Sequence, residues 1–184
     1  MGRGTYHHGS LRSALLQQAR ALLDEAGPEA VTLREAARRA GVSATATYRH
    51  FRDKDALLAA VAAEGFAQFA ECLDASVRDG RPYAEMCRAY VAFALERPGL
   101  FRLMFSPLIQ AREAHPELAA ASAKAFGVLQ AAMTTQTPYP GAPPSCRISA
   151  WARVHGLSHL MLDGIFPVES RAEILERILG PPAP

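Results

Sequence analysis

Three side chains that can bind a metal recur at a four-residue spacing near the carboxyl end of the chain. His155, His159 and Asp163 stand at positions i, i+4 and i+8, so a helix would carry them on one face. Imidazole nitrogens and carboxylate oxygens are zinc ligands, but no fourth ligand is apparent. We therefore predict no metal here and keep a helical metal-binding protein as an alternative. Nothing in the sequence resembles a nucleophile with its base, a phosphate loop or a cofactor fingerprint, so we expect no catalytic residue and no cofactor.

The most informative stretch lies between Thr32 and Lys54, where two short helices are expected on either side of a tight turn. Thr32 begins a T-x-x-E capping box, and Ser43 can cap the second helix. Gly41 can adopt the positive φ that a tight turn demands, and the small side chain of Ala36 lets the two helices approach. This is the form of a helix-turn-helix, whose second helix points its amino end outward and suits a phosphate. By spacing alone, an αα-hairpin inside a helical bundle fits equally well.

The composition predicts an all-α fold, whose helices would position these residues. The chain has 36 Ala and 20 Leu, against 13 for Val and Ile together, and no alternation of period two persists. Alanine and leucine favour helices, whereas β-branched residues favour strands. A second capping box, Ser170 to Glu173, marks the start of the last helix. We expect about nine helices, over residues 10–26, 32–40, 43–51, 53–78, 82–97, shortly after 99, after 116, 145–163 and 171–179, with a proline-rich loop at 138–144.

Charge is distributed unevenly over the 184 residues. Residues 1–60 hold nine Lys/Arg and six Asp/Glu, a formal charge of +3, whereas residues 61–184 hold eleven and twelve, a formal charge of −1. A basic first third on a nearly neutral remainder favours contact with a polyanion at the amino end.

The sequence also predicts the compartment. No apolar stretch reaches 18 residues, and the amino terminus lacks the apolar segment of a signal peptide, so we expect neither a transmembrane helix nor secretion. Cys72, Cys87 and Cys146 are widely spaced and odd in number, which is typical of reduced core residues. We therefore expect a cytoplasmic protein with no membrane partner.

Several strings of residues extend the helix-turn-helix pattern. They are Tyr6-His7-His8-Gly9-Ser10-Leu11-Arg12, Ala14-Leu15-Leu16, Gly41-Val42-Ser43 and Tyr48-Arg49-His50-Phe51-Arg52-Asp53-Lys54-Asp55-Ala56-Leu57-Leu58. In this order they resemble the TetR family of bacterial transcription regulators. Trp151-Ala152-Arg153-Val154-His155-Gly156-Leu157, followed by Leu162-Asp163-Gly164, is similar to the Trp-His-Gly type of regulatory domain found in part of that family.

The resemblance implies two domains. An N-terminal three-helix helix-turn-helix DNA-binding domain over residues 1–54 would be joined by the long helix 53–78 to a helical-bundle regulatory and dimerisation domain over residues 55–184. The last two long helices, about 146–163 and 171–179, would pack with those of a second copy as a four-helix bundle. The dimer residues that this implies are Leu157, Leu160, Met161, Ile174, Leu175 and Ile178.

For double-stranded DNA, the resemblance implies that a recognition helix from Ser43 to Phe51 enters the major groove. Thr45 and Ala46 would face base edges, and Thr47 would join them or the DNA backbone. Phe51 would close the core, and Tyr48 would be half-buried with its hydroxyl on a phosphate. The run Ala44 to Thr47 departs from close relatives, many of which carry Pro or Gly there, which leaves the operator sequence open. The implied DNA contacts are Thr32, Ser43, Ala44, Thr45, Ala46, Thr47, Tyr48, His50 and Lys54, with Arg3 reaching a minor groove.

Aromatic and methionine side chains of the middle helices can line an apolar cavity, although each is also an ordinary core residue. No charge cluster marks a charged ligand, so we expect a small, largely apolar effector. The function expected is therefore a homodimeric repressor released from a near-palindromic operator by that effector, with a DNA-binding regulator lacking any small ligand as an alternative. The expected ligand residues are Phe66, Phe69, Met86, Tyr90, Phe101, Met104, Phe105, Phe126, Trp151 and His155.

Overall fold

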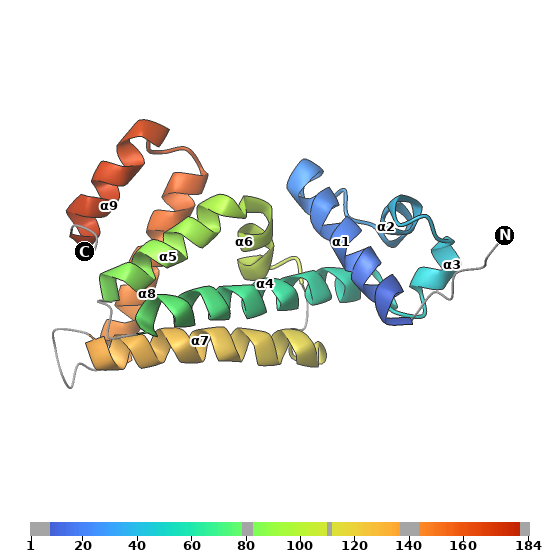
Figure 1. Ribbon diagram of the computed structural model, residues 1–184, viewed down its shortest axis with the longest axis horizontal. Coiled ribbons are helices and arrows are strands. Elements are labelled where there is room, and N and C mark those ends of the chain that lie inside the picture. The colour runs from blue at the N-terminus through green and yellow to red at the C-terminus, as the bar shows by residue number, and fades with distance from the viewer. Residues whose placement is uncertain (1–7, 79–82, 110–111, 137–143, 181–184) are drawn as a thin grey trace. The chain divides into compact units, whose positions relative to one another are not determined.

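The computed structural model describes residues 8–78, 83–109, 112–136 and 144–180. Within these ranges the chain forms nine α-helices and no strand (Figure 1), as the composition predicts. Arg3 and all of the proline-rich segment except Pro144 lie outside the described residues.

The chain forms two compact units. The first comprises residues 1–65 and 99–119, and the second comprises residues 66–98 and 120–184. Three helices contribute residues to both units: α4 (Lys54–Val77), α7 (Pro116–Gln136) and α6 (Pro98–Phe105), of which only Pro98 belongs to the second unit.

The first unit contains α1 (His8–Ala26), α2 (Leu33–Arg39), α3 (Ala44–Thr47), the start of α4 and most of α6 (Pro98–Phe105). Apolar residues of α1 at helical spacing, such as Leu15, Ala19 and Leu22, are buried as expected. Helix α4 meets α6 at Gly65, where an added Cβ would lie 2.9 Å from both Leu100 Cδ1 and Met104 Sδ. A side chain at position 65 would therefore push these two helices apart.

The second unit contains the rest of α4 and α7 together with α5 (Tyr83–Glu96), α8 (Pro144–Leu162) and α9 (Arg171–Leu179). Helix α5 packs on α8 and also contacts α9 (Figure 1). Its buried residues face an aromatic core to which α4 adds Phe66 and Phe69. Helix α9, in contrast, has no fully buried residue.

Helix α4 is long and apolar enough to cross a membrane by length and composition. Two thirds of its most apolar window, 67%, is buried inside the protein, which is the property of a core helix. It is the only such helix among the described residues.

The expected capping box at Ser170 is wrong. Ser170 makes no side-chain hydrogen bond to the start of α9, and its φ of −88° and ψ of −8° are helical. An N-cap needs an extended residue, whereas Ser170 ends the short 3-10 helix Val168–Ser170. The preceding helical turn therefore prevents the cap.

Candidate DNA-binding site

The two helix starts in the helix-turn-helix are capped by side chains, as the sequence predicts. Thr32 Oγ1 accepts from the Glu35 N–H at 3.1 Å, and Ser43 Oγ accepts from the Ala46 N–H at 3.3 Å. Both cap residues are extended, with φ of −133° and −69° and ψ near 150°. These bonds satisfy amide groups that a helix start leaves without intrahelical partners.

The turn between α2 and α3 closes on a glycine. Gly41 has a φ of +69°, in the left-handed region that glycine adopts without steric cost. The Gly41 N–H donates to Arg38 O at 3.3 Å, and the Val42 N–H donates to Ala37 O at 3.0 Å. These two bonds form a Schellman motif, which ends α2 and sets the direction in which the chain enters α3.

Charged side chains fasten α2 to α1. The Glu35 carboxylate accepts from Arg38 Nε at 2.8 Å and from Arg39 Nε at 3.1 Å, and Arg39 also lies 2.7 Å from Glu25 on α1. The hydrogen bonds from Arg38 and then Arg39 lower the pKa of Glu35 to about 2. Arg38 and Arg39 are therefore engaged with carboxylates of the protein itself.

The recognition helix is shorter than expected. Helix α3 ends at Thr47 instead of Phe51, and the Thr47 carbonyl accepts from both the His50 and Phe51 N–H groups at 2.9 Å. Phe51 then enters the core with 3% of its surface exposed, as expected. Asp53 Oδ1 accepts from the Ala56 N–H at 2.7 Å and caps α4. The chain therefore leaves α3 through one hydrogen-bonded turn, which ends shortly before the Asp53 cap of α4.

The residues expected to contact bases differ in exposure. Thr45 is exposed, while Ala44 and Ala46 are half-buried. Thr47 is 0% exposed, and its hydroxyl donates to Ala44 O at 2.6 Å, so this side chain packs inward. Only the first three of these residues offer side-chain surface to a DNA groove.

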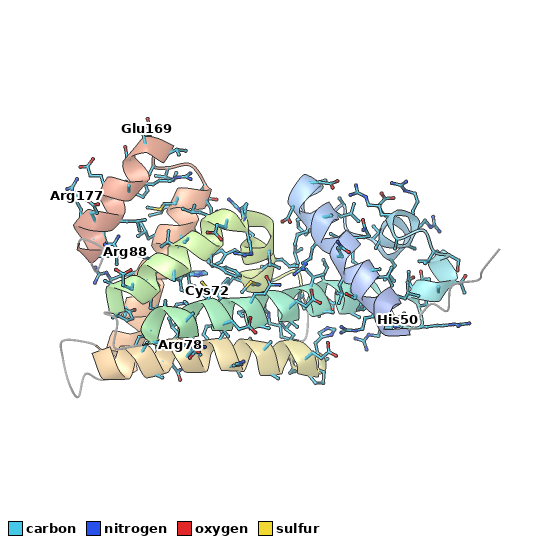
Figure 2. All side chains as sticks on the ribbon, in the orientation of Figure 1. His50, Cys72, Arg78, Arg88, Glu169 and Arg177 are labelled. Atoms are coloured by element: carbon cyan, nitrogen blue, oxygen red, sulfur yellow. The ribbon has the colours of Figure 1, made fainter. Side chains whose placement is uncertain are left out.

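The residues expected to contact phosphates lie around this short helix. Tyr48 is 61% exposed, more than the half-buried position expected, because it follows α3 with a helical backbone that directs its side chain to solvent. Thr32 and Ser43 are exposed at their helix starts, and His50 is half-buried (Figure 2). The ammonium of Lys54 donates to Glu29 O at 3.3 Å and lies 3.7 Å from the Glu29 carboxylate.

Two cations near α3 were not singled out from the sequence. Arg34 on α2 and Arg49 directly after α3 are both exposed. Across the part of the chain that the structure describes, neither makes a hydrogen bond or an ion pair. An unpaired exposed guanidinium next to a helix-turn-helix suits a DNA phosphate. The excess of basic residues in the first third was the only sign of them.

Seven of the ten expected ligand residues belong to the second unit, and Phe101, Met104 and Phe105 belong to the first. In the second unit, the Phe69 ring meets Tyr90 edge-on at 4.8 Å and the Phe126 ring meets Trp151 edge-on at 5.2 Å. Trp151 Nε1 donates to Tyr90 Oη at 3.2 Å, and Tyr90 Oη lies 2.9 Å from His155 Nδ1. The residues that the structure joins there are Phe66, Phe69, Tyr90, Phe126, Trp151 and His155, while Met86 is a buried residue of α5.

His155 belongs to this aromatic cluster. Burial, and then the charge of His159, lower its pKa from 6.5 to about 4, so the imidazole is neutral near pH 7. The rings of His155 and His159 stand 4.7 Å apart. Among the described residues, no group of three or more His, Cys, Asp or Glu side chains is arranged to hold a metal.

The expected dimer residues divide into two sets. Leu157 and Met161 are buried within the protomer, whereas Leu160 and Ile178 are exposed and Ile174 and Leu175 are partly exposed. Sequence reasoning did not single out three further exposed apolar side chains in the same part of the chain: Ile148, Ile165 and Val168.

Comparison with known protein families gives two matches. The family described as "Bacterial regulatory proteins, tetR family" matches residues 15–61, which include α2, α3 and the turn between them. The family described as "Tetracyclin repressor-like, C-terminal domain" matches residues 83–180, more than half of the chain. No curated protein matches the sequence.

Solved structures share the fold along nearly the whole chain. A protein of unknown function from Rhodococcus sp. RHA1 is 28% identical, with a TM-score of 0.76, over 96% of this chain and 95% of that one. A TetR family transcription regulator from Marinobacter aquaeolei VT8 is 22% identical, with a TM-score of 0.60, over 94% of each chain. The multidrug binding protein EbrR, complexed with imidazole, is 23% identical, with a TM-score of 0.57, over 94% of this chain and 96% of that one.

The similarities to the Marinobacter regulator and to EbrR, both below 25% sequence identity, show a shared fold only. The family matches, the capped helix-turn-helix and the all-α fold together identify the chain as a member of the TetR family, and therefore as a DNA-binding transcription regulator and not an enzyme.

Proposed function

We propose that this regulator is a homodimeric, cytoplasmic repressor that leaves a near-palindromic operator when a small, largely apolar effector binds. Residues 1–54 would bind DNA, and residues 55–184 would bind the effector and the second copy. The proposal depends most on one observation: between the Gly41 turn and the core residue Phe51, Thr45 on the short, capped α3 and Tyr48 directly after it are exposed to solvent.

The DNA interface follows from this exposed helix. Thr45 and Ala46 would meet base edges, through the hydroxyl of one and the methyl groups of both. Tyr48, Arg49 and Arg34 would bind phosphates and set the register of the helix in the groove. Thr47 is buried, so we leave it out of the proposed interface.

Exposed apolar residues support the dimer. Ile148 and Leu160 on α8, Ile178 on α9 and Ile165 and Val168 between these helices leave apolar surface in water. Such surface, concentrated on two consecutive helices, favours burial against a second copy of the same helices. A two-fold dimer would place its recognition helices on two half-sites of a palindrome.

An effector site in the second unit is supported by its aromatic residues, and by the ligand named for EbrR. A ligand that prefers a conformation with low DNA affinity lowers the affinity of the protein for DNA. By linkage, DNA lowers the affinity of the protein for the ligand by the same factor. The alternative is a regulator with no small ligand, whose DNA binding depends on its abundance or on a protein partner.

Selection from a library of random DNA duplexes tests the DNA-binding part. The expected result is enrichment of a palindrome whose half-sites lie about one helical turn apart. Retention without sequence preference, abolished by salt, would show phosphate attraction only and would contradict the proposed operator. A reporter gene placed behind the enriched palindrome then distinguishes repression from activation.

A further inference from the structure

A cavity of about 180 Å³ lies within the second unit, between α5, α8 and α9. None of the ten ligand residues expected from the sequence lines it. Its wall is mostly apolar, with Val154 and Leu157 from α8 and Ile178 and Leu179 from α9. We call it the α5/α8/α9 cavity.

The size of the cavity limits its occupant. An engineered cavity of about 150 Å³ binds benzene, whereas sites for drug-sized molecules measure about 300–1,000 Å³. At about 180 Å³, the α5/α8/α9 cavity suits a molecule with one ring or a short alkyl chain.

One cation on the wall has no partner. Arg153 is exposed and makes no ion pair or hydrogen bond within residues 8–78, 83–109, 112–136 and 144–180. Arg88, the other guanidinium near this wall, lies 3.4 Å from Glu85 and donates to the Gly180 carbonyl (Figure 2). The Arg88 charge is thus compensated and the Arg153 charge is not, which favours an anionic group at Arg153.

The hydroxyl of Tyr83, on the same wall, also lacks an oxygen or nitrogen as hydrogen-bond partner in the described part of the chain. It is buried beside the Cys87 thiol, which is a weak hydrogen-bonding group. Tyr83, Cys87 and Arg153 line the same cavity: burial raises the pKa of Tyr83 and Cys87, and the charge of Arg153 acts on both in the opposite direction. A buried hydroxyl without an oxygen or nitrogen partner is destabilising, and an oxygen of a ligand would supply the missing hydrogen bond.

We propose that the α5/α8/α9 cavity binds a small organic acid, with its apolar part inside the cavity and its carboxylate on Arg153 and the Tyr83 hydroxyl. This refines the effector from a largely apolar molecule to an amphipathic acid, and it rests on the proposed function only in calling that acid the effector.

The test is a titration of the full-length protein with benzoate and hexanoate and with their neutral counterparts, benzamide and hexanamide. The fluorescence of Trp151, the one tryptophan in the sequence and the neighbour of the wall residue Ala150, reports binding, and calorimetry gives the affinity. We expect each acid to bind saturably and about tenfold or more tightly than its amide. Equal affinity for acid and amide, or no binding by either, would overturn the proposal.

Three variants locate the site. Arg153→Gln removes only the charge and should reduce the affinity for the acid to that for the amide. Arg177 lies on α9 (Figure 2) and is not among the residues that line the cavity, and its side chain is 77% exposed, so Arg177→Gln makes the same change elsewhere and should preserve the preference for the acid. Ala150→Phe fills the cavity and should abolish binding of both probes while circular dichroism shows an unchanged helix content. Unaltered binding by Ala150→Phe would place the site elsewhere and refute the assignment.

DNA binding measured without any acid separates the two proposals. If DNA binding is sequence-specific but the acids do not bind, the cavity assignment fails and the proposed function stands. If the acids bind as expected but DNA binding is not sequence-specific, the cavity assignment stands and the proposed operator fails. If Ala150→Phe dissociates a dimer and the acids never bind, a second copy occupies the cavity and the small-acid proposal is wrong.

Discussion

The His115 imidazole Nε2 stands 2.7 Å from the Asp55 carboxylate, and the His115 side chain is only 10% exposed. Asp55 lies in the first turn of α4, directly after Lys54, and His115 directly precedes α7. An ion pair, Arg12 to Glu117 at 2.5 Å, also joins the start of α7 to α1. The start of α7 is thus fastened by polar side-chain contacts to both α1 and α4.

Replacing Asp55 by Asn should therefore destabilise the protein. His115 would lose its charged partner in a position that water reaches poorly, and we expect a loss of about 1–2 kcal/mol in the free energy of unfolding. Urea denaturation measures it. Asp74→Asn makes the same change on the same helix, at an exposed pair with Arg78, and should cost less than about 0.5 kcal/mol. Equal losses in the two variants would contradict a special role for the Asp55 pair.

Arg49→Gln should weaken binding to all DNA sequences about equally. If this guanidinium binds a phosphate, its removal also lowers the slope of log affinity against log salt by about 1. Fluorescence anisotropy with the selected duplex at several salt concentrations provides both values. Arg177→Gln serves as the control for net charge and should leave the slope unchanged. An unaltered slope in Arg49→Gln would remove Arg49 from the interface.

Thr45→Ala should instead change sequence preference. Loss of a hydroxyl contact to a base edge costs about 1–3 kcal/mol at one base pair of each half-site and little elsewhere. Competition among duplexes with single base changes measures this. Thr47→Val, at a buried position, should alter stability more than preference, because its hydroxyl already donates to Ala44 O. If both variants changed preference alike, the proposed division between the exposed and buried threonines would be wrong.

Acid should destabilise the protein through His155. The pKa of this group is about 4 in the folded chain and 6.5 without the protein environment, so the unfolded chain binds more protons between these values. Stability is therefore highest above pH 6.5 and falls as the pH decreases toward 4. Discounted for the partial exposure of the ring, the loss from pH 7.5 to 5 should be about 1 kcal/mol. In His155→Gln this part of the pH dependence should disappear, and an unchanged dependence would assign it to another group.

Two glycine substitutions should have opposite signs. Gly41→Ala places a Cβ at a φ of +69° and should cost about 1 kcal/mol. Gly127→Ala lies in α7 with no atom within 4 Å of the added Cβ, and should stabilise by about 0.5–1 kcal/mol. Thermal and urea denaturation of both variants check the pair. A stabilised Gly41→Ala would mean that the turn does not require a left-handed residue.

Local features of the site could be predicted from the sequence. The caps by Thr32 and Ser43 and the positive φ of Gly41 depend on bonds between residues only a few positions apart. Such bonds follow from the side chain and its spacing, so short motifs predict them well. The burial of Phe51 follows likewise from an apolar ring at the end of a polar turn.

Features that depend on the flanking elements could not be predicted. Ser170 has the sequence of a capping box, but the 3-10 turn before it makes its backbone helical. Thr47 is buried and the next residue, Tyr48, is exposed, because packing against the core decides which side of this turn is covered. Residues 99–119 join the first unit through contacts distant in sequence, and the α5/α8/α9 cavity needs three separate helices.

Helix α9 buries none of its residues fully, and it is fastened by two guanidinium bonds, from Arg171 to Met161 O and from Arg88 to Gly180 O. Detachment of α9 therefore exposes little additional apolar surface to water. This local opening should cost only a small part of the free energy of global unfolding. In hydrogen exchange of a protomer that no second copy covers, the amides of α9 should be among the first helical amides to take up deuterium. One wall of the cavity would thus undock and redock while the rest of the second unit stays folded.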